Sequence, residues 1–210
     1  YFPDTAEEVL DQNSDAITAA AKMGEQLIVF KENSIFAIGY SYDGKDVYYP
    51  VRECHSAIGC DMPGSVQLID NRLVFAHSRS GVHMLVSTDN ALENIVKPLS
   101  ANINALLLRE PDLKNACSCD FERYYWLKAG GHVYLWDYDT TPYYNYADYD
   151  KAQRRLAWYR FDNMDAAVFC PLEGALCYGG AEGIVRLTRG QNDFGKPINA
   201  YFVSKAFDMG

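Results

Sequence analysis

The residues of this 210-residue chain that could do chemistry are four histidines, six cysteines and a run of aspartates and tyrosines. The histidines lie between residues 55 and 132 and form no local ligand pattern. His77 and His83 fall on adjacent expected strands and could face each other, but two histidines without a third ligand do not make a metal site. The chain also lacks a GxSxG motif, a Walker loop and a dinucleotide fingerprint. The sequence therefore predicts no catalytic residues, no metal and no cofactor.

The six cysteines form three pairs that are close in sequence: Cys54 with Cys60, Cys117 with Cys119, and Cys170 with Cys177. The first pair flanks HSAIG, a spacing that a disulfide or a metal could close. Members of the second pair would share one face of a strand, and those of the third could lie on neighbouring strands. Reduced thiols that serve as small apolar side chains are the favoured interpretation, with disulfides and a metal site as alternatives.

A tyrosine-rich acidic loop, residues 139–150, is the candidate binding site. Its candidate residues are Tyr143, Tyr144, Tyr146, Asp148, Tyr149 and Asp150. Tyrosine offers a large contact area and a polar tip, which suits binding to proteins or sugars. The alternative is a loop that folds onto its own sheet.

The same region raises two further hypotheses, since Asp137 and Asp139 precede the loop's other aspartates. Two carboxylates at a suitable separation could hydrolyse a glycoside. An Asp-x-Asp sequence also resembles part of a calcium loop, but the glycine and terminal glutamate of an EF-hand are missing. Acids interleaved with tyrosine and asparagine are more typical of a solvated loop.

Composition excludes several classes of protein. The formal net charge of −9 and the isoelectric point near 4.9 argue against a nucleic-acid surface, which needs clustered Lys and Arg. The hydrophobic content of 49% can fill a core. No apolar run approaches the roughly 18 residues that span a bilayer, and the first residues do not form a signal peptide. Because no initiator Met is present, we expect a segment of a longer protein.

Short apolar runs separated by turn residues recur four times and predict β-meanders. The first apolar residues of the four central strands are Leu27, Leu73, Tyr124 and Leu176, so the repeats are roughly 50 residues apart, as four-stranded propeller blades require. We expect an all-β fold, a β-propeller or propeller fragment with about four blades of four-stranded antiparallel meanders.

Residues 1–210 should form a single propeller-like domain with blades at about 15–53, 65–99, 116–162 and 166–208. Residues 1–14 read as a surface segment, and residues 100–108 as a short helix or crossover. The expected outer strands span residues 47–53, 94–99, 156–162 and 199–207. Pro50 would be tolerated in the first of these because an outer strand is an edge strand.

Five segments of the sequence together resemble a known family: LIVFKENSIFAIGY, CHSAIGCDMPGSVQLIDNRLVFAHSRSGVHML, LAWYRFD, ALCYGGAEGIVRL and PINAYFVSKAFDMG. This series is similar to the propeller-forming structural proteins of tailed bacteriophages and prophages. The resemblance covers most of residues 26–210, although Ser204 stands where that family usually has Thr.

The resemblance implies a non-enzymatic virion component, at the tail or the head-to-tail junction, assembled in the cytoplasm of a bacterial host. Its partners would be other virion proteins, with copies of itself among the possibilities, and neither nucleic acid, membrane nor a small-molecule ligand. Two rival hypotheses stay open. One is a carbohydrate-binding or carbohydrate-active propeller that uses loop 139–150, with Trp158 as a further stacking platform. The other is a calcium-stabilised adhesion domain.

Overall fold

The structure, a computed structural model, describes residues 10, 15–87, 94–140, 156–181, 183–188, 190 and 192–201. These residues form an all-β fold made of several four-stranded antiparallel sheets. The first sheet has the order β1-β2-β3-β6, with β1 Ile17–Met23, β2 Gln26–Lys31, β3 Ile35–Ile38 and β6 Val51–His55. The second has the order β7-β8-β9-β10, with β7 Gln67–Ile69, β8 Arg72–His77, β9 Gly81–Ser87 and β10 Asn94–Pro98.

The second half of the chain repeats this arrangement. The third sheet has the order β11-β12-β13-β14, with β11 Cys117–Phe121, β12 Tyr124–Ala129, β13 His132–Asp137 and β14 Trp158–Phe161. The fourth has three strands in the described residues, β15 Val168–Leu172, β16 Ala175–Gly180 and β17 Gly183–Arg186. Two small hairpins complete the strands: β4 Ser41–Tyr42 with β5 Val47–Tyr48, and β18 Asn192–Asp193 with β19 Lys196–Pro197.

Short helical segments connect the second and third sheets to their neighbours. The 3-10 helix η1, Pro63–Ser65, precedes β7, while α1, Asn104–Leu107, and the 3-10 helix η2, Leu113–Asn115, lie between β10 and β11. Residues 100–108, expected to be a short helix or a crossover, thus contain a short helix. Here the chain passes from the outer strand of one sheet to the first strand of the next.

Tight turns fix the register within the sheets. Ile69 lies opposite Arg72, so only Asp70 and Asn71 form the β7–β8 turn, and both have positive φ, 46° and 61°. Asp and Asn tolerate this left-handed conformation better than most residues, and it matches the twist of a two-residue hairpin. The β11–β12 turn has the same geometry at Glu122 and Arg123.

Successive sheets pack face to face because side chains alternate across each strand. In β8, Leu73 and Phe75 pack against the first sheet, whereas Val74 and Ala76 pack against the third. All four are completely buried. A strand with both faces covered reads as a continuous apolar run, as RLVFAH does.

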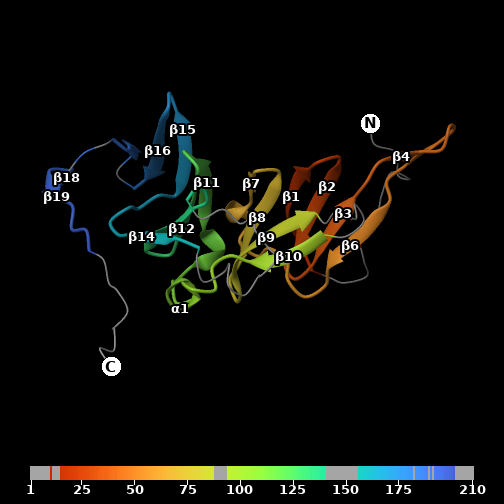
Figure 1. The fold of residues 1–210 in the computed structure, drawn as a ribbon, viewed down its shortest axis with the longest axis horizontal. Helices are drawn as coiled ribbons and strands as arrows, with labels where there is room; N and C mark the ends of the chain where they lie inside the picture. Colours follow the sequence, from red (N-terminus) through yellow and green to blue (C-terminus); the bar gives the residue numbers. More distant parts are fainter. Residues whose placement is uncertain are drawn as a thin grey trace.

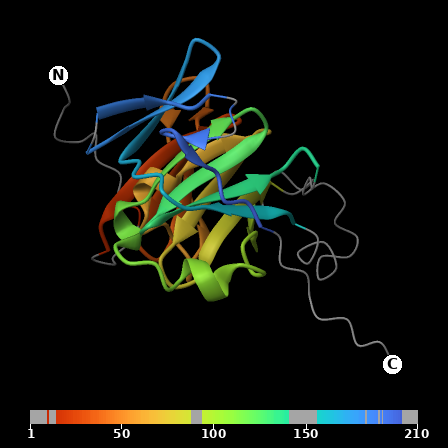
Figure 2. The same ribbon diagram turned by 90° about the vertical axis from the view of Figure 1, so that its left-hand side faces the viewer.

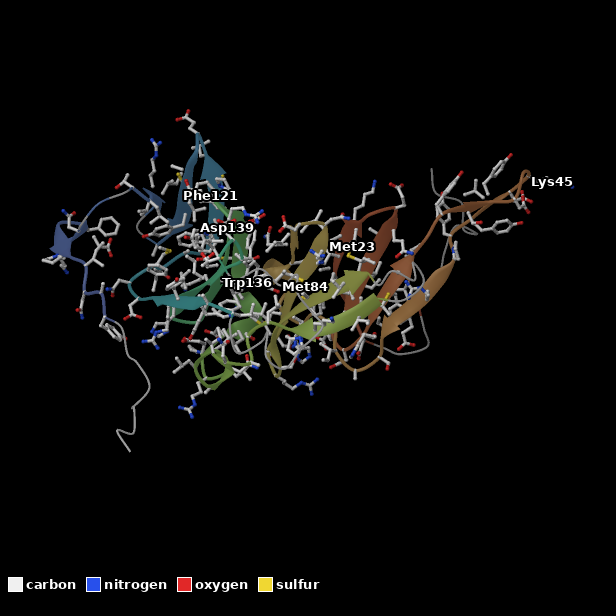
Figure 3. The ribbon with its side chains drawn as sticks, in the orientation of Figure 1. Met23, Lys45, Met84, Phe121, Trp136 and Asp139 are labelled. Carbon is white, nitrogen blue, oxygen red and sulfur yellow. The ribbon has the colours of Figure 1, made fainter. Side chains whose placement is uncertain are left out.

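The third sheet is an interior layer of the same kind. Tyr125 and Leu127 of β12 pack toward the second sheet, while Trp126 lies against the cluster shared with the fourth sheet. Trp136 of β13, with 1% of its surface exposed, belongs to the same cluster as Met84 of the second sheet (Figure 3). Each apolar cluster thus joins two sheets.

The four sheets follow one another in chain order along the long axis of the molecule (Figure 1). The first sheet lies at one end of this row and the fourth at the other, so the two end sheets do not cover each other. Seen from the fourth-sheet end, the sheets lie one behind another (Figure 2). The described residues form no closed barrel or ring.

Of the predicted outer strands, one needs correction and another is described only in part. The strand expected over residues 47–53 is interrupted, because β5 ends at Tyr48 and β6 begins only at Val51. Pro50 between them has no N–H to donate, and its carbonyl accepts a hydrogen bond from the Gly39 amide at 3.0 Å. In the segment 199–207, residues 199–201 form no strand, and the rest lies outside the described residues.

Gly64 provides a test of this stacked arrangement, because the chain passes very close to the start of the third sheet there. A Cβ at Gly64 would collide with the backbone carbonyl of Ala116. We expect Gly64→Ala to destabilise the protein by about 1–3 kcal/mol, since the two crossovers must separate to make room. Urea unfolding measures this loss.

Gly190→Ala is the control, because the nearest atom to its added methyl group would be 3.9 Å away, an ordinary contact. An equal effect of the two substitutions would show that sheet stacking does not depend on the close approach at Gly64.

Candidate interaction surface

The six residues of the predicted binding site, Tyr143, Tyr144, Tyr146, Asp148, Tyr149 and Asp150, lie outside the described residues. The aspartates at the start of that region are described and have structural partners. Asp137 is buried and accepts hydrogen bonds from the amide and the hydroxyl of Thr140, at 2.9 and 2.7 Å. Asp139 forms an ion pair with Arg123 at 3.1 Å. Both carboxylates hold turns next to the third sheet.

Trp158, proposed as a stacking platform for sugars, is partly buried and packs against the core cluster of the second and third sheets. Its ring lies 6.4 Å from that of Trp136, with an interplanar angle of 23°, and meets the ring of Tyr125 edge-on. Its indole N–H donates to the carbonyl of Leu99 at 3.0 Å. Since this side chain joins the second and third sheets, it is a packing residue.

The histidines of the second sheet share a face but do not pair directly. His77 lies opposite Gly81, and His83 lies opposite Phe75, on which its ring stacks at 5.7 Å. His83 Nε2 is 2.8 Å from the hydroxyl of Ser80, whereas Nδ1 has no hydrogen-bond partner in the described structure. Burial, reinforced by the positive potential of His77 and His55, lowers the pKa of His83 to about 4. A neutral, buried imidazole of this kind is a packing group at neutral pH.

A second polar cluster surrounds Glu110, which precedes η2. Its carboxylate accepts hydrogen bonds from the Tyr134 hydroxyl at 2.8 Å and the Gly131 amide at 3.0 Å, and lies 2.6 Å from His132 Nδ1. Burial alone would raise the pKa of Glu110, but these hydrogen bonds outweigh it, so the pKa is lowered. The other nitrogen of His132 lies 3.3 Å from Asp162. This cluster fastens the crossover between the second and third sheets to the β12–β13 hairpin.

A depression of about 370 Å³ lies beside this cluster. It is lined by Pro111, Asp112, Asn115, Lys128, Gly130, Gly131 and Ala166. The Lys128 ammonium group donates a hydrogen bond to the carbonyl of Gly130 at 2.6 Å, so it holds the hairpin turn. Among the described residues, no group of three or more His, Cys, Asp or Glu side chains could hold a metal ion.

Four exposed tyrosines of the described chain are grouped on residues 39–50, here called the tyrosine arm. This segment contains the β4–β5 hairpin and projects away from the first sheet (Figure 1), with Lys45 at its far end (Figure 3). Its aromatic residues are Tyr40, Tyr42, Tyr48 and Tyr49, each with between 49% and 65% of its surface exposed. The rings of Tyr40 and Tyr49 meet edge-on at 6.2 Å. Solvent-exposed aromatic groups on a projecting hairpin are typical of a binding surface.

Asp43 organises the tip of the arm. One carboxylate oxygen accepts the amides of Lys45 and Asp46 at 2.9 and 2.8 Å, and the other accepts the Tyr48 hydroxyl at 2.8 Å. The hydrogen bonds from the Asp46 and Lys45 amides, with that from Tyr48, lower the pKa of Asp43. The hydrogen bond from the Tyr48 hydroxyl to Asp43 raises the pKa of Tyr48. The tip is therefore a structured turn that fixes the position of one aromatic ring.

The arm was not among the binding residues predicted from the sequence. The signal that could have found it is the sequence YSYDGKDVYY, in which tyrosines lie on both sides of a strong Asp-Gly turn. Pro50 follows immediately and separates this hairpin from the outer strand β6. Together these features indicate a separate hairpin with exposed aromatic residues.

No protein-family model matches the sequence, and no curated protein matches it. The described part of the chain contains no helix with the length and apolar character needed to cross a membrane.

His83 makes the stability of the fold depend on pH. Its folded pKa of about 4 lies below its ordinary value of 6.5, so its contribution is complete above about pH 6.5 and is lost as the pH falls toward 4. We expect the free energy of unfolding to fall by about 2–3 kcal/mol between pH 7 and pH 4.5 from this group. Urea unfolding at both pH values should show this fall, and His83→Gln should remove it.

Ser80→Ala serves as the matched control, because it deletes the partner of His83 Nε2 and leaves the titrating imidazole in place. This variant should be less stable at both pH values and keep the pH dependence. If His83→Gln also kept the pH dependence of the free energy of unfolding, other groups would be responsible for the acid sensitivity.

Proposed function

We propose that this chain is a non-enzymatic structural component of a tailed-phage or prophage virion, at the tail or the head-to-tail junction. In this role it acts as a rigid platform that binds other virion proteins, with further copies of the same chain among the possible partners. The resemblance of the sequence to propeller-forming phage proteins motivates the proposal.

We further propose that the stacked sheets belong to a β-propeller or a fragment of one. Three features support this. The strand order in each four-stranded sheet follows the chain, apart from the inserted β4–β5 hairpin. Each outer strand leads to the first strand of the next sheet, and neighbouring sheets pack face to face. Radially repeated blades require this connectivity.

The observation that carries the platform hypothesis is the tyrosine arm on a stacked, well-packed body. Interfaces concentrate their binding energy in a few aromatic residues, and tyrosine is among the most enriched. An arm that extends beyond the first sheet can reach a neighbouring subunit while the sheets remain in place. The proposal that the chain is not an enzyme rests on the polar groups near Glu110 and His83, because their contacts hold turns and crossovers in place.

The test is to compare particles assembled with the wild-type chain and with the triple variant Tyr40→Ser, Tyr42→Ser and Tyr49→Ser. We expect mass spectrometry to find the wild-type chain in purified tailed particles. Incorporation of the variant should fall about tenfold or more. A tenfold loss of affinity corresponds to roughly 1.4 kcal/mol, and removing aromatic contacts from an interface can cost that much. Tyr48 is kept because it supports the tip through Asp43.

Tyr159→Ser is the control, because Tyr159 lies on β14 outside the arm and has 50% of its surface exposed. It should be incorporated like the wild type, and all variants should keep the thermal unfolding midpoint of the wild type within a few degrees. Absence of the wild-type chain from purified particles would contradict the virion role. Equal incorporation of the triple variant would exclude the arm as the interface.

A further inference from the structure

The outer face of the fourth sheet carries two cysteines that lie directly opposite each other. Cys170 of β15 and Cys177 of β16 are partners in the antiparallel register, as the sequence suggested they could be. Both are thiols in the structure. The neighbouring positions Phe169 and Tyr178 point to the other face, where they pack against the third sheet. By this alternation the two thiols share the face of the fourth sheet opposite to Phe169 and Tyr178.

The register places the two backbones at a distance that a disulfide can bridge. Directly opposite residues of an antiparallel pair have Cα atoms about 4.5–5.5 Å apart, within the range of about 4.4–6.8 Å seen in disulfides. The turn at Glu173 and Gly174, both with positive φ, joins Leu172 to its partner Ala175 and fixes this register. A slip by one residue would move the buried Phe169 to the exposed face.

Accessibility distinguishes the roles of the two thiols. Cys170 is exposed and flanked by Val168 and Leu172, which are more than half exposed, whereas only 5% of the surface of Cys177 is exposed. An oxidant in solution can therefore reach Cys170 directly. Cys177 can then react with Cys170 across the strand pair.

Other cysteines are protected by their surroundings. Burial, with the nearby Asp120 carboxylate, raises the pKa of Cys119 to about 11, and burial also raises the pKa of Cys60 and Cys117. Only the thiolate attacks a disulfide, so these three thiols react slowly at neutral pH. The exposed member of the cross-strand pair is the more accessible target.

We propose that Cys170 and Cys177 form a site of reversible oxidation, where a disulfide oxidant such as oxidised glutathione produces a cross-strand disulfide. The Cys170 thiolate attacks one sulfur of the oxidant, forms a mixed disulfide and releases one glutathione thiol. Cys177 then attacks the Cys170 sulfur of this mixed disulfide and releases the second. The two protein thiols lose two electrons and two protons, and the oxidant is reduced to two glutathione thiols.

This disulfide is expected to be easily reduced. Cβ atoms of directly opposite strand residues are about 4.5–5.5 Å apart, whereas a relaxed disulfide needs about 3.5–4.5 Å. Closing the bond draws the two strands together and stores strain, and strained, exposed disulfides are the labile ones. The site would staple the hairpin at the end of the row that faces the viewer in Figure 2.

The test is to incubate the native full chain with oxidised glutathione, block the remaining thiols with iodoacetamide, denature and digest. Trypsin leaves both cysteines on one peptide, residues 161–186, because no Lys or Arg lies between them. Cleavage after Glu173 then separates them unless the disulfide is present. We expect the two pieces of this peptide to stay joined after cleavage. Their mass should be lower by two hydrogens than that of the two reduced pieces together, and neither cysteine should carry an alkyl group. Dithiothreitol should then release the two pieces.

Two variants separate the steps. Cys177→Ser should accumulate the mixed disulfide at Cys170, and Cys170→Ser should slow the modification of Cys177 about tenfold or more, because its remaining thiol is buried. A wild-type chain that holds glutathione on Cys170 while Cys177 is alkylated would overturn the proposal. Linkage of Cys170 to Cys119 would also overturn it.

Discussion

The structure depends on one constraint: each interior sheet must bury both of its faces against different neighbours. Side chains alternate across a strand, so one strand supplies two cores at once. In β8, Leu73 and Val74 are adjacent in sequence and completely buried, yet they belong to different clusters. Burying a large apolar side chain contributes about 1.5–3 kcal/mol, so sheet-to-sheet contact is the dominant stabilising term. The chain can satisfy it because each outer strand leads directly into the next sheet.

Buried hydroxyl groups make this stacking specific, since the ends of the strands need hydrogen bonds inside the core. The Ser65 hydroxyl accepts the Ala76 amide at 2.8 Å and donates to the Met62 carbonyl at 2.6 Å. The Tyr125 hydroxyl reaches across from the third sheet and donates to the Ser65 carbonyl at 2.8 Å. Serine is small enough to sit beside a neighbouring sheet and polar enough to satisfy an amide that would otherwise be unpaired. The crossover at η1 thereby joins two sheets through hydrogen bonds as well as packing.

The strands themselves could be predicted from the sequence, because period-two alternation between turn residues is a local signal. This holds for β2 and β16, which begin at Gln26 and Ala175, each one residue before the first apolar residue expected for its strand, Leu27 or Leu176. The error at Pro50 has a local cause that alternation alone does not show: without an amide proton, proline divides the apparent strand into the hairpin strand β5 and the outer strand β6. Which of the tyrosine-rich segments is exposed depends on tertiary packing. Tyr125 and Tyr40 are equally aromatic in sequence, but one is completely buried and the other is 65% exposed.

The same contrast explains why histidines and acids were poor guides to a site. His83, Glu110 and Asp137 are all side chains of types that can catalyse reactions, but each has a structural contact. His83 stacks on the ring of Phe75, Glu110 accepts a hydrogen bond from the Gly131 amide, and Asp137 accepts one from the Thr140 amide. Removing such a group leaves its hydrogen-bond partner unsatisfied, so each of these side chains contributes to the stability of the fold. The tyrosine arm has the opposite properties. Its exposed rings contribute little to the stacked core, so they can make outside contacts while the sheets stay intact, and the proposed interface depends on this property.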